Sequence, residues 1–166
     1  VAKLGAKLNA KVLSRSPYGT YKLTVGETIV DICMSRTERY SKPAGKPLIS
    51  PASVIMDMHR RDFSVNAIAL PLFPRKSATL IDPTDGLADI KNRSIRVLHH
   101  NSFIDDPTRI IRAIRYEQRL GFTIEPTTFK LLLKDKEHLH LLPTTKVRKI
   151  LEEIFAEEHV EQVINR

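Results

Sequence analysis

The sequence predicts an α+β fold, with antiparallel strands in its first third and helices in its second half. Three observations predict it: an alternating apolar pattern near the start, strong helix boundary signals after residue 105, and a sizeable apolar fraction. The chain has 166 residues, of which 42% are hydrophobic. That content is enough for a substantial core, so we expect one globular domain, or one domain with a small neighbour.

The strand signal lies in residues 20–34. The segment TYKLTV alternates apolar and polar side chains, Gly26 and Glu27 are suited to a tight turn, and TIVDICM follows. This pattern predicts an antiparallel hairpin. Asp31 then shares a face with Cys33, opposite the face that carries Val30. Considered alone, Asp31 is an ordinary solvent-facing acid, and Cys33 is expected to be a small buried hydrophobe.

A short helix and another strand are expected next. Ser50 and Pro51 resemble an N-cap and a first helical position, so a helix should run from there to the arginines of HRRDF. Its expected buried stripe consists of Val54, Ile55 and Met58. SVNAIAL, residues 64–70, predicts a strand, and LIDPTDGLADI carries strong turn signals.

The second half predicts three helices. Asp106, Pro107 and Gly121 bracket the first with an acid for the N-cap, a proline start and a glycine stop. Two more are expected near residues 126–138 and 144–158. In the first helix a basic stripe of Arg112, Arg115 and Arg119 lies apart from Ile110 and Ile114. Such a stripe either is solvated or contacts phosphate.

The net charge, the apolar runs and the cysteine content indicate which partners and which cellular compartment to expect. The net charge of +8 indicates a polyanionic partner, either nucleic acid or nucleotide phosphates. No apolar run approaches the roughly 20 residues of a membrane span, and no secretion signal is evident. Cys33 is the single cysteine and cannot form an internal disulfide. We therefore expect a soluble protein without a membrane partner, in the reducing cytoplasm.

Four ordered segments resemble one family. VDICMSRTERY, HRRDFSVNAIAL, DPTDGLADIKNRSIRVL and FIDDPTRIIRAIRYEQRLGF are similar to consecutive motifs of class II tRNA nucleotidyltransferases and bacterial poly(A) polymerases. The resemblance implies a partial polymerase-beta-like head over residues 1–98 and a helical neck with a nucleobase-recognition helix over residues 99–166. It also implies template-independent addition of CMP or AMP, from CTP or ATP, to the 3′ end of tRNA or another RNA.

The resemblance assigns roles to several side chains. Asp31 falls where the family has one of its carboxylates for Mg²⁺, a metal that prefers oxygen ligands. Arg61 and Asp62 would line the nucleotide cleft, the first against phosphate or ribose and the second against a sugar hydroxyl. Asn66 is expected in the same nucleotide site, and so are Arg112 and Arg115.

Asp106 and Arg109 are expected to read the base. Their i, i+3 spacing at a helix start places an acceptor beside a donor. Cytosine and adenine present an exocyclic amine beside an unprotonated ring nitrogen, so this pair fits both and rejects uracil and guanine. In FIDDPTR, Asp105 replaces the glutamate usual in the family motif. The simpler alternative is that Asp106 only caps the helix and Arg109 is a surface cation.

One departure from the family pattern stands out. Neither a Gly-Gly-x-x-Arg-Asp turn nor an Asp-x-Asp strand precedes TYKLTV. Two of the three expected metal carboxylates are therefore missing, and we expect an internal fragment or one piece of a split enzyme, inactive without a missing N-terminal segment or a partner chain. The alternative function is a noncatalytic RNA- or nucleotide-binding module that kept the fold.

Overall fold

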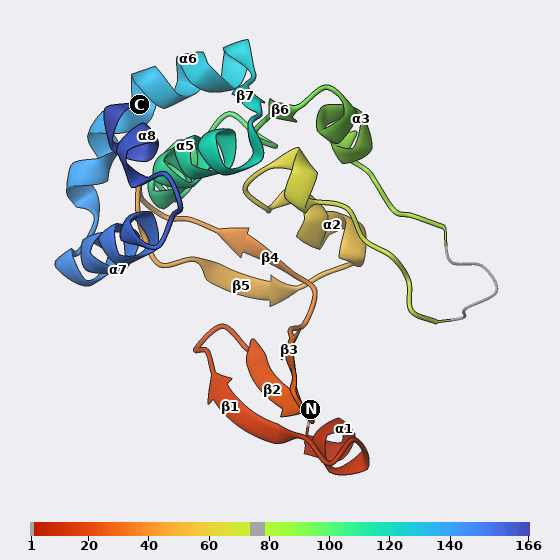
Figure 1. Ribbon diagram of the computed structural model, residues 1–166. Helices are drawn as coiled ribbons and strands as arrows, with labels where there is room; N and C mark the ends of the chain where they lie inside the picture. The colour runs from red at the N-terminus through yellow and green to blue at the C-terminus, as the bar shows by residue number, and fades with distance from the viewer. Residues whose placement is uncertain (1, 74–78) are drawn as a thin grey trace.

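A small antiparallel sheet forms one end of the molecule. The computed structural model describes residues 2–73 and 79–166. Helix α1 (Ala2–Lys7) is followed by a sheet with strand order β1-β2-β3, whose strands are β1 (Lys11–Arg15), β2 (Tyr21–Val25) and β3 (Thr28–Ile32). Gly26 makes the β2–β3 turn with φ 60°, a conformation that glycine adopts at low cost. The predicted hairpin is confirmed, and Figure 1 shows the sheet and α1 at the end opposite to α5–α8.

A second hairpin precedes helix α2 (Val54–His59). Strands β4 (Arg36–Arg39) and β5 (Leu48–Pro51) pair antiparallel, and α2 follows. The predicted helix start at Ser50 is wrong, because Ser50 and Pro51 pair with β4. Ser53 is the N-cap instead, and its hydroxyl accepts from the Met56 amide at 3.3 Å.

The predicted buried stripe of α2 is also largely wrong. Val54 and Ile55 are exposed, and the buried residues of α2 are Asp57 and Met58. The polar side of this short helix faces the inside of the molecule, because Asp57 binds the amide of Arg36 in β4.

The predicted strand over residues 64–70 is wrong. Ser64–Asn66 form the 3-10 helix η1, and beyond it Ala69 makes an isolated bridge with Ile81. The Ser64 hydroxyl donates to Asp89 of α3 (Gly86–Lys91). A Cβ on Gly86 would lie 2.3 Å from the Ser64 carbonyl oxygen, so glycine is needed where α3 crosses η1.

The second half is helical, as predicted. Strands β6 (Ser94–Ile95) and β7 (Thr123–Ile124) pair parallel beside α4 (Ser102–Asp105), α5 (Thr108–Leu120), α6 (Pro126–Asp135), η3 (Lys136–Leu141), α7 (Thr144–Phe155) and α8 (Val160–Asn165). Gly121 ends α5 with φ 61°. The N-cap of α5 is Pro107, one residue later than predicted, although Asp106 still accepts from the Thr108 amide at 3.3 Å.

The main core lies between α5, α6 and the segments around β6. Its buried members are Phe63, Ile95, Val97, Phe103, Ile110, Ala113, Ile124 and Leu132. Phe63 pairs through its backbone with Val97, so the segment after α2 is built into this core. The arrangement confirms an α+β fold. Among the described helices, none has the length and apolar content needed to cross a membrane.

Candidate functional site

A polar cavity of about 610 Å³ lies where the end of α2, the segment after it and the start of α5 meet. Six predicted site residues line it, namely Arg61, Asp62, Asn66, Asp106, Arg109 and Arg112. They come from two regions about 40 residues apart in the sequence. The remaining lining residues are Cys33, Glu38, Tyr40, Arg60, Thr108 and Tyr116. The fold therefore gathers most of the predicted nucleotide site in one place.

Asp62 accepts four hydrogen bonds in the cavity. Its Oδ1 accepts from the Phe63 amide at 2.9 Å and the Asn66 side chain at 3.0 Å. Its Oδ2 accepts from Arg112 Nε at 2.8 Å and is also bonded by Arg112 Nη2. Burial alone would raise the pKa of Asp62, but Arg112 and these hydrogen bonds outweigh it and hold the pKa below its ordinary value. Asp62 is thus a charged anchor between η1 and α5.

Arg109 and Asp106 come from the first turn of α5 and the residue before its N-cap. Arg109 is almost fully buried, and its Nη2 donates to the Arg60 carbonyl oxygen at 3.0 Å. Asp106 Oδ1 accepts from the Thr108 hydroxyl at 2.8 Å and lies 3.7 Å from Lys146 Nζ. Among the described residues Asp106 Oδ2 has no hydrogen-bond donor. Asp106 therefore keeps one acceptor available at the cavity.

Two carboxylates outside the predicted site hold the arginines of the cavity, namely Asp57, which does not line it, and Glu38, which does. Asp57 Oδ1 accepts from Arg60 Nη2 at 2.7 Å, and its Oδ2 accepts from Arg61 Nη2 at 3.1 Å. Glu38 accepts from Arg60 Nη1 at 3.0 Å and from the Tyr40 hydroxyl at 3.0 Å. Burial, and then the neighbouring Glu38, raise the pKa of Tyr40 above its ordinary value. The signal for Asp57 was its i, i+3 and i, i+4 spacing to the two arginines.

Two arginines of the predicted basic stripe bind α7 and the segment after it. Arg115 Nε donates to Glu157 at 2.8 Å and Arg119 Nε donates to Glu157 at 2.9 Å, while Arg115 Nη1 pairs with Glu153 of α7. Arg115 lines a neighbouring hollow of about 240 Å³ with Asp106 and Arg112, and the structure does not bring it into the larger cavity.

Asp31 lies outside the cavity. It is exposed in β3, where it pairs across the sheet with Lys22. Cys33, two residues further along the extended chain, does line the cavity, and its exposure shows that the predicted buried cysteine is wrong. Within residues 2–73 and 79–166, no three His, Cys, Asp or Glu side chains gather to form a metal site. Asp31 alone does not provide the ligand set that Mg²⁺ requires.

The sequence and the fold both match known nucleotidyltransferases. Residues 2–96 match the model of the poly A polymerase head domain. The chain belongs to this family. It is 41% identical over 137 residues to the A-adding tRNA nucleotidyltransferase of Aquifex aeolicus, covering 82% of this chain and 16% of that protein. It is 37% identical over 149 residues to the enzyme of the same name from Geobacter sulfurreducens, covering 89% of this chain and 17% of that protein.

Solved structures of family members superpose on nearly the whole chain. A CCA-adding enzyme in an apo form matches with a TM-score of 0.89 and 37% identity, over 99% of this chain and 40% of that one. A tRNA nucleotidyltransferase complexed with a primer tRNA and an incoming ATP analog matches with a TM-score of 0.80 and 31% identity, over 99% and 46%. The chain therefore has the family fold and spans less than half the length of these relatives.

Proposed function

We propose that this chain forms the nucleotide-binding part of an enzyme that adds CMP or AMP, from CTP or ATP, to the 3′ end of tRNA or another RNA without a template. The supporting observation is the cavity that joins Arg61, Asp62 and Asn66 to Asp106, Arg109 and Arg112. In this proposal, residues 1–98 are part of the catalytic head and residues 99–166 are the neck.

Base selection would come from Asp106 and Arg109. Cytosine and adenine both offer an exocyclic N–H donor beside a ring nitrogen acceptor, which match the free Oδ2 of Asp106 and the remaining N–H donors of Arg109. Uracil and guanine offer a carbonyl and an N–H in those places. They would set acceptor against acceptor and donor against donor, and such unpaired buried groups are costly.

Phosphate binding would come from the more exposed arginines. Arg61 and Arg112 have side chains that are 42% and 39% exposed, so both can reach a triphosphate in the cavity. Arg112 also holds Asp62 Oδ2. A sugar hydroxyl that bonds this oxygen would have to share it with Arg112 or displace Arg112 toward the phosphates.

A noncatalytic RNA- or nucleotide-binding module is the second candidate. It is favoured by the position of Asp31, which no other possible metal ligands join into a site among the described residues, since Mg²⁺-assisted nucleotidyl transfer would need further carboxylates from a longer chain or a partner.

Binding and incorporation assays with the pure chain test both candidates. We expect the chain to bind ATP and CTP more tightly than GTP and UTP in calorimetric titrations, and to add no nucleotide to a tRNA transcript in Mg²⁺. Asp106→Asn, which replaces one acceptor with an ambiguous amide, should reduce the preference by about tenfold. Equal binding of all four nucleotides would contradict base recognition, and incorporation by the chain alone would contradict its dependence on added carboxylates.

A further inference from the structure

The guanidinium of Arg109 is held by groups from separate segments. Its Nη1 donates to Ser102 Oγ at 2.7 Å, and its Nη2 donates to the backbone oxygen of Arg60 at 3.0 Å. His99 Nε2 lies 3.5 Å from Nη1. Ser102 is 0% exposed and Arg109 is 6% exposed, so these contacts are protected from solvent.

Two fixed hydrogen bonds determine the plane of a guanidinium. The group is planar and carries five N–H donors in a rigid fork, so its remaining donors point in set directions once Nη1 and Nη2 are bound. A nucleobase edge is also planar, and its hydrogen bonds weaken steeply when the donor is misaligned. The orientation of Arg109 therefore decides whether it can match a base.

We infer that Ser102 is a specificity-determining positioning residue: its buried hydroxyl, together with the Arg60 carbonyl, fixes Arg109 in the orientation that selects cytosine and adenine. Ser102 does not line the cavity and acts through Arg109 alone. The inference rests on the proposed function, in which Arg109 reads the base.

The Arg60 carbonyl oxygen, the second acceptor for Arg109, connects the base-reading residue to the phosphate-binding residue Arg61. Arg60 is the C-cap of α2 and directly precedes Arg61. Its own side chain is fixed by Asp57 and Glu38. The Arg60 carbonyl oxygen is therefore held in a fixed position. The Ser102 hydroxyl then determines the rotation of the Arg109 guanidinium about its hydrogen bond to that oxygen.

Nucleotide binding by the 166-residue chain tests this role. Calorimetry would compare the unsubstituted chain with Ser102→Ala and Ser102→Cys, using ATP, CTP, GTP, UTP and inorganic tripolyphosphate. Ser102→Cys keeps the buried side chain close to its size but offers only a weak acceptor, so it separates the hydrogen bond from the packing. Both variants should lose about five- to tenfold in ATP and CTP affinity and keep their affinity for tripolyphosphate, which has no base.

Ser64→Ala is the matched control. Ser64 is also fully buried, and its hydroxyl donates to Asp89 rather than contacting Arg109. It should lower the melting temperature and leave the preference for ATP and CTP intact. A retained preference in both Ser102 variants, or an equal loss for tripolyphosphate, would overturn the positioning role. Absence of any preference in the unsubstituted chain would instead overturn the proposed base recognition, and this role with it.

Discussion

Asp57 does not line the cavity but holds two arginines that do. Its two carboxylate oxygens hold Arg60 and Arg61 and accept the Arg36 amide, which joins α2 to β4. Burial would raise the pKa of Asp57, but the hydrogen bond from Arg36 and the contacts of Arg60 and Arg61 lower it overall. The charged form of Asp57 therefore stabilises the folded state.

Asp57→Asn should lower the free energy of unfolding by about 3 kcal/mol at pH 7, because it leaves partly buried arginines without their counter-charge. A group whose pKa is depressed on folding contributes stability above its unfolded pKa of about 4 and loses that contribution as the pH falls through the folded value. The difference between Asp57→Asn and the unsubstituted chain should thus shrink below pH 4 in urea titrations.

Glu152→Gln is the control for this measurement. Glu152 also pairs with an arginine, Arg148, at i, i+4 spacing, but both side chains are highly exposed. Its loss should change stability by less than about 0.5 kcal/mol. Similar effects of the two substitutions would contradict the buried role of Asp57.

Motif residues were easier to predict than the groups that hold them. Asp62, Asp106 and Arg109 were predicted because their segments resemble the motifs of the family, and for Asp106 and Arg109 the donor and acceptor pattern of the bases supported the same roles. Ser102 was not, because a buried serine is a common residue and its partner is set only by the tertiary fold. Asp57 was not, although its spacing to Arg60 and Arg61 is local, because its burial and its bond to the Arg36 amide depend on the tertiary fold. The same reason explains Cys33, whose exposure depends on the cavity beside it.

At the scale of elements, α5 joins the core, the cavity and the C-terminal helices. Ile110 and Ala113 are buried in the core, Arg109 and Arg112 face the cavity, and Arg115 binds Glu157. The proline start and the glycine stop predicted this helix. They did not show which neighbour each arginine would meet, since α7 and the segment after it are brought close only by the loops between them.

Arg115 and Glu157 should be energetically coupled. A double-mutant cycle with Arg115→Ala and Glu157→Gln should give a coupling energy of about 1 kcal/mol in urea unfolding, because a charge-assisted hydrogen bond links the two side chains. A value near zero would contradict the link. ATP titrations of the same variants test the predicted phosphate contact of Arg115, which requires a loss of affinity in Arg115→Ala and none in Glu157→Gln.

The local sequence pattern predicted the wrong element where the residues bind or pair with a neighbouring element. SVNAIAL resembles a strand in composition, yet Ser64 bonds Asp89 and η1 packs under α3. Ser50 and Pro51 resemble a helix start, yet β4 pairs with them. The hairpin over residues 20–34 and the helix ending at Gly121 were predicted correctly because their turn and stop signals are local.

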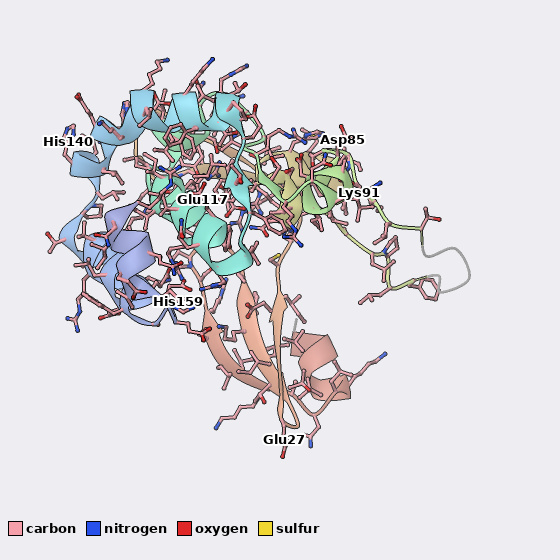
Figure 2. The ribbon with its side chains drawn as sticks, turned by 45° about the horizontal axis from the view of Figure 1, so that its top comes forward. Glu27, Asp85, Lys91, Glu117, His140 and His159 are labelled. Atoms are coloured by element: carbon pink, nitrogen blue, oxygen red, sulfur yellow. The ribbon has the colours of Figure 1, made fainter. Side chains whose placement is uncertain are left out.

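At the scale of the whole molecule, the two predicted parts share one core. Phe63, Ile95 and Val97 precede the predicted boundary at residue 98 and pack with Phe103 and Ile110 after it. The sheet of β1–β3 is separate from this core and is linked to β4 by Arg36 Nη1, which donates to the Tyr18 carbonyl oxygen at 2.9 Å. In Figure 2, Glu27 marks the far tip of this sheet and Glu117 lies among the helices.

This arrangement predicts two folding units whose border lies near residue 35 rather than at residue 98. Phe63 and Leu23 are both 0% exposed, the first in the main core and the second in β2. Phe63→Ala should cost about 3 to 5 kcal/mol and Leu23→Ala about 2 to 5 kcal/mol, each within its own unit. Native-state hydrogen exchange should then show weaker protection of α5 and β6 in Phe63→Ala, with β2 and β3 unchanged, and the reverse in Leu23→Ala.

Loss of protection throughout the chain in both variants would mean one cooperative unit. A loss in Phe63→Ala that stops at residue 98 would instead make the predicted head and neck boundary a folding boundary as well.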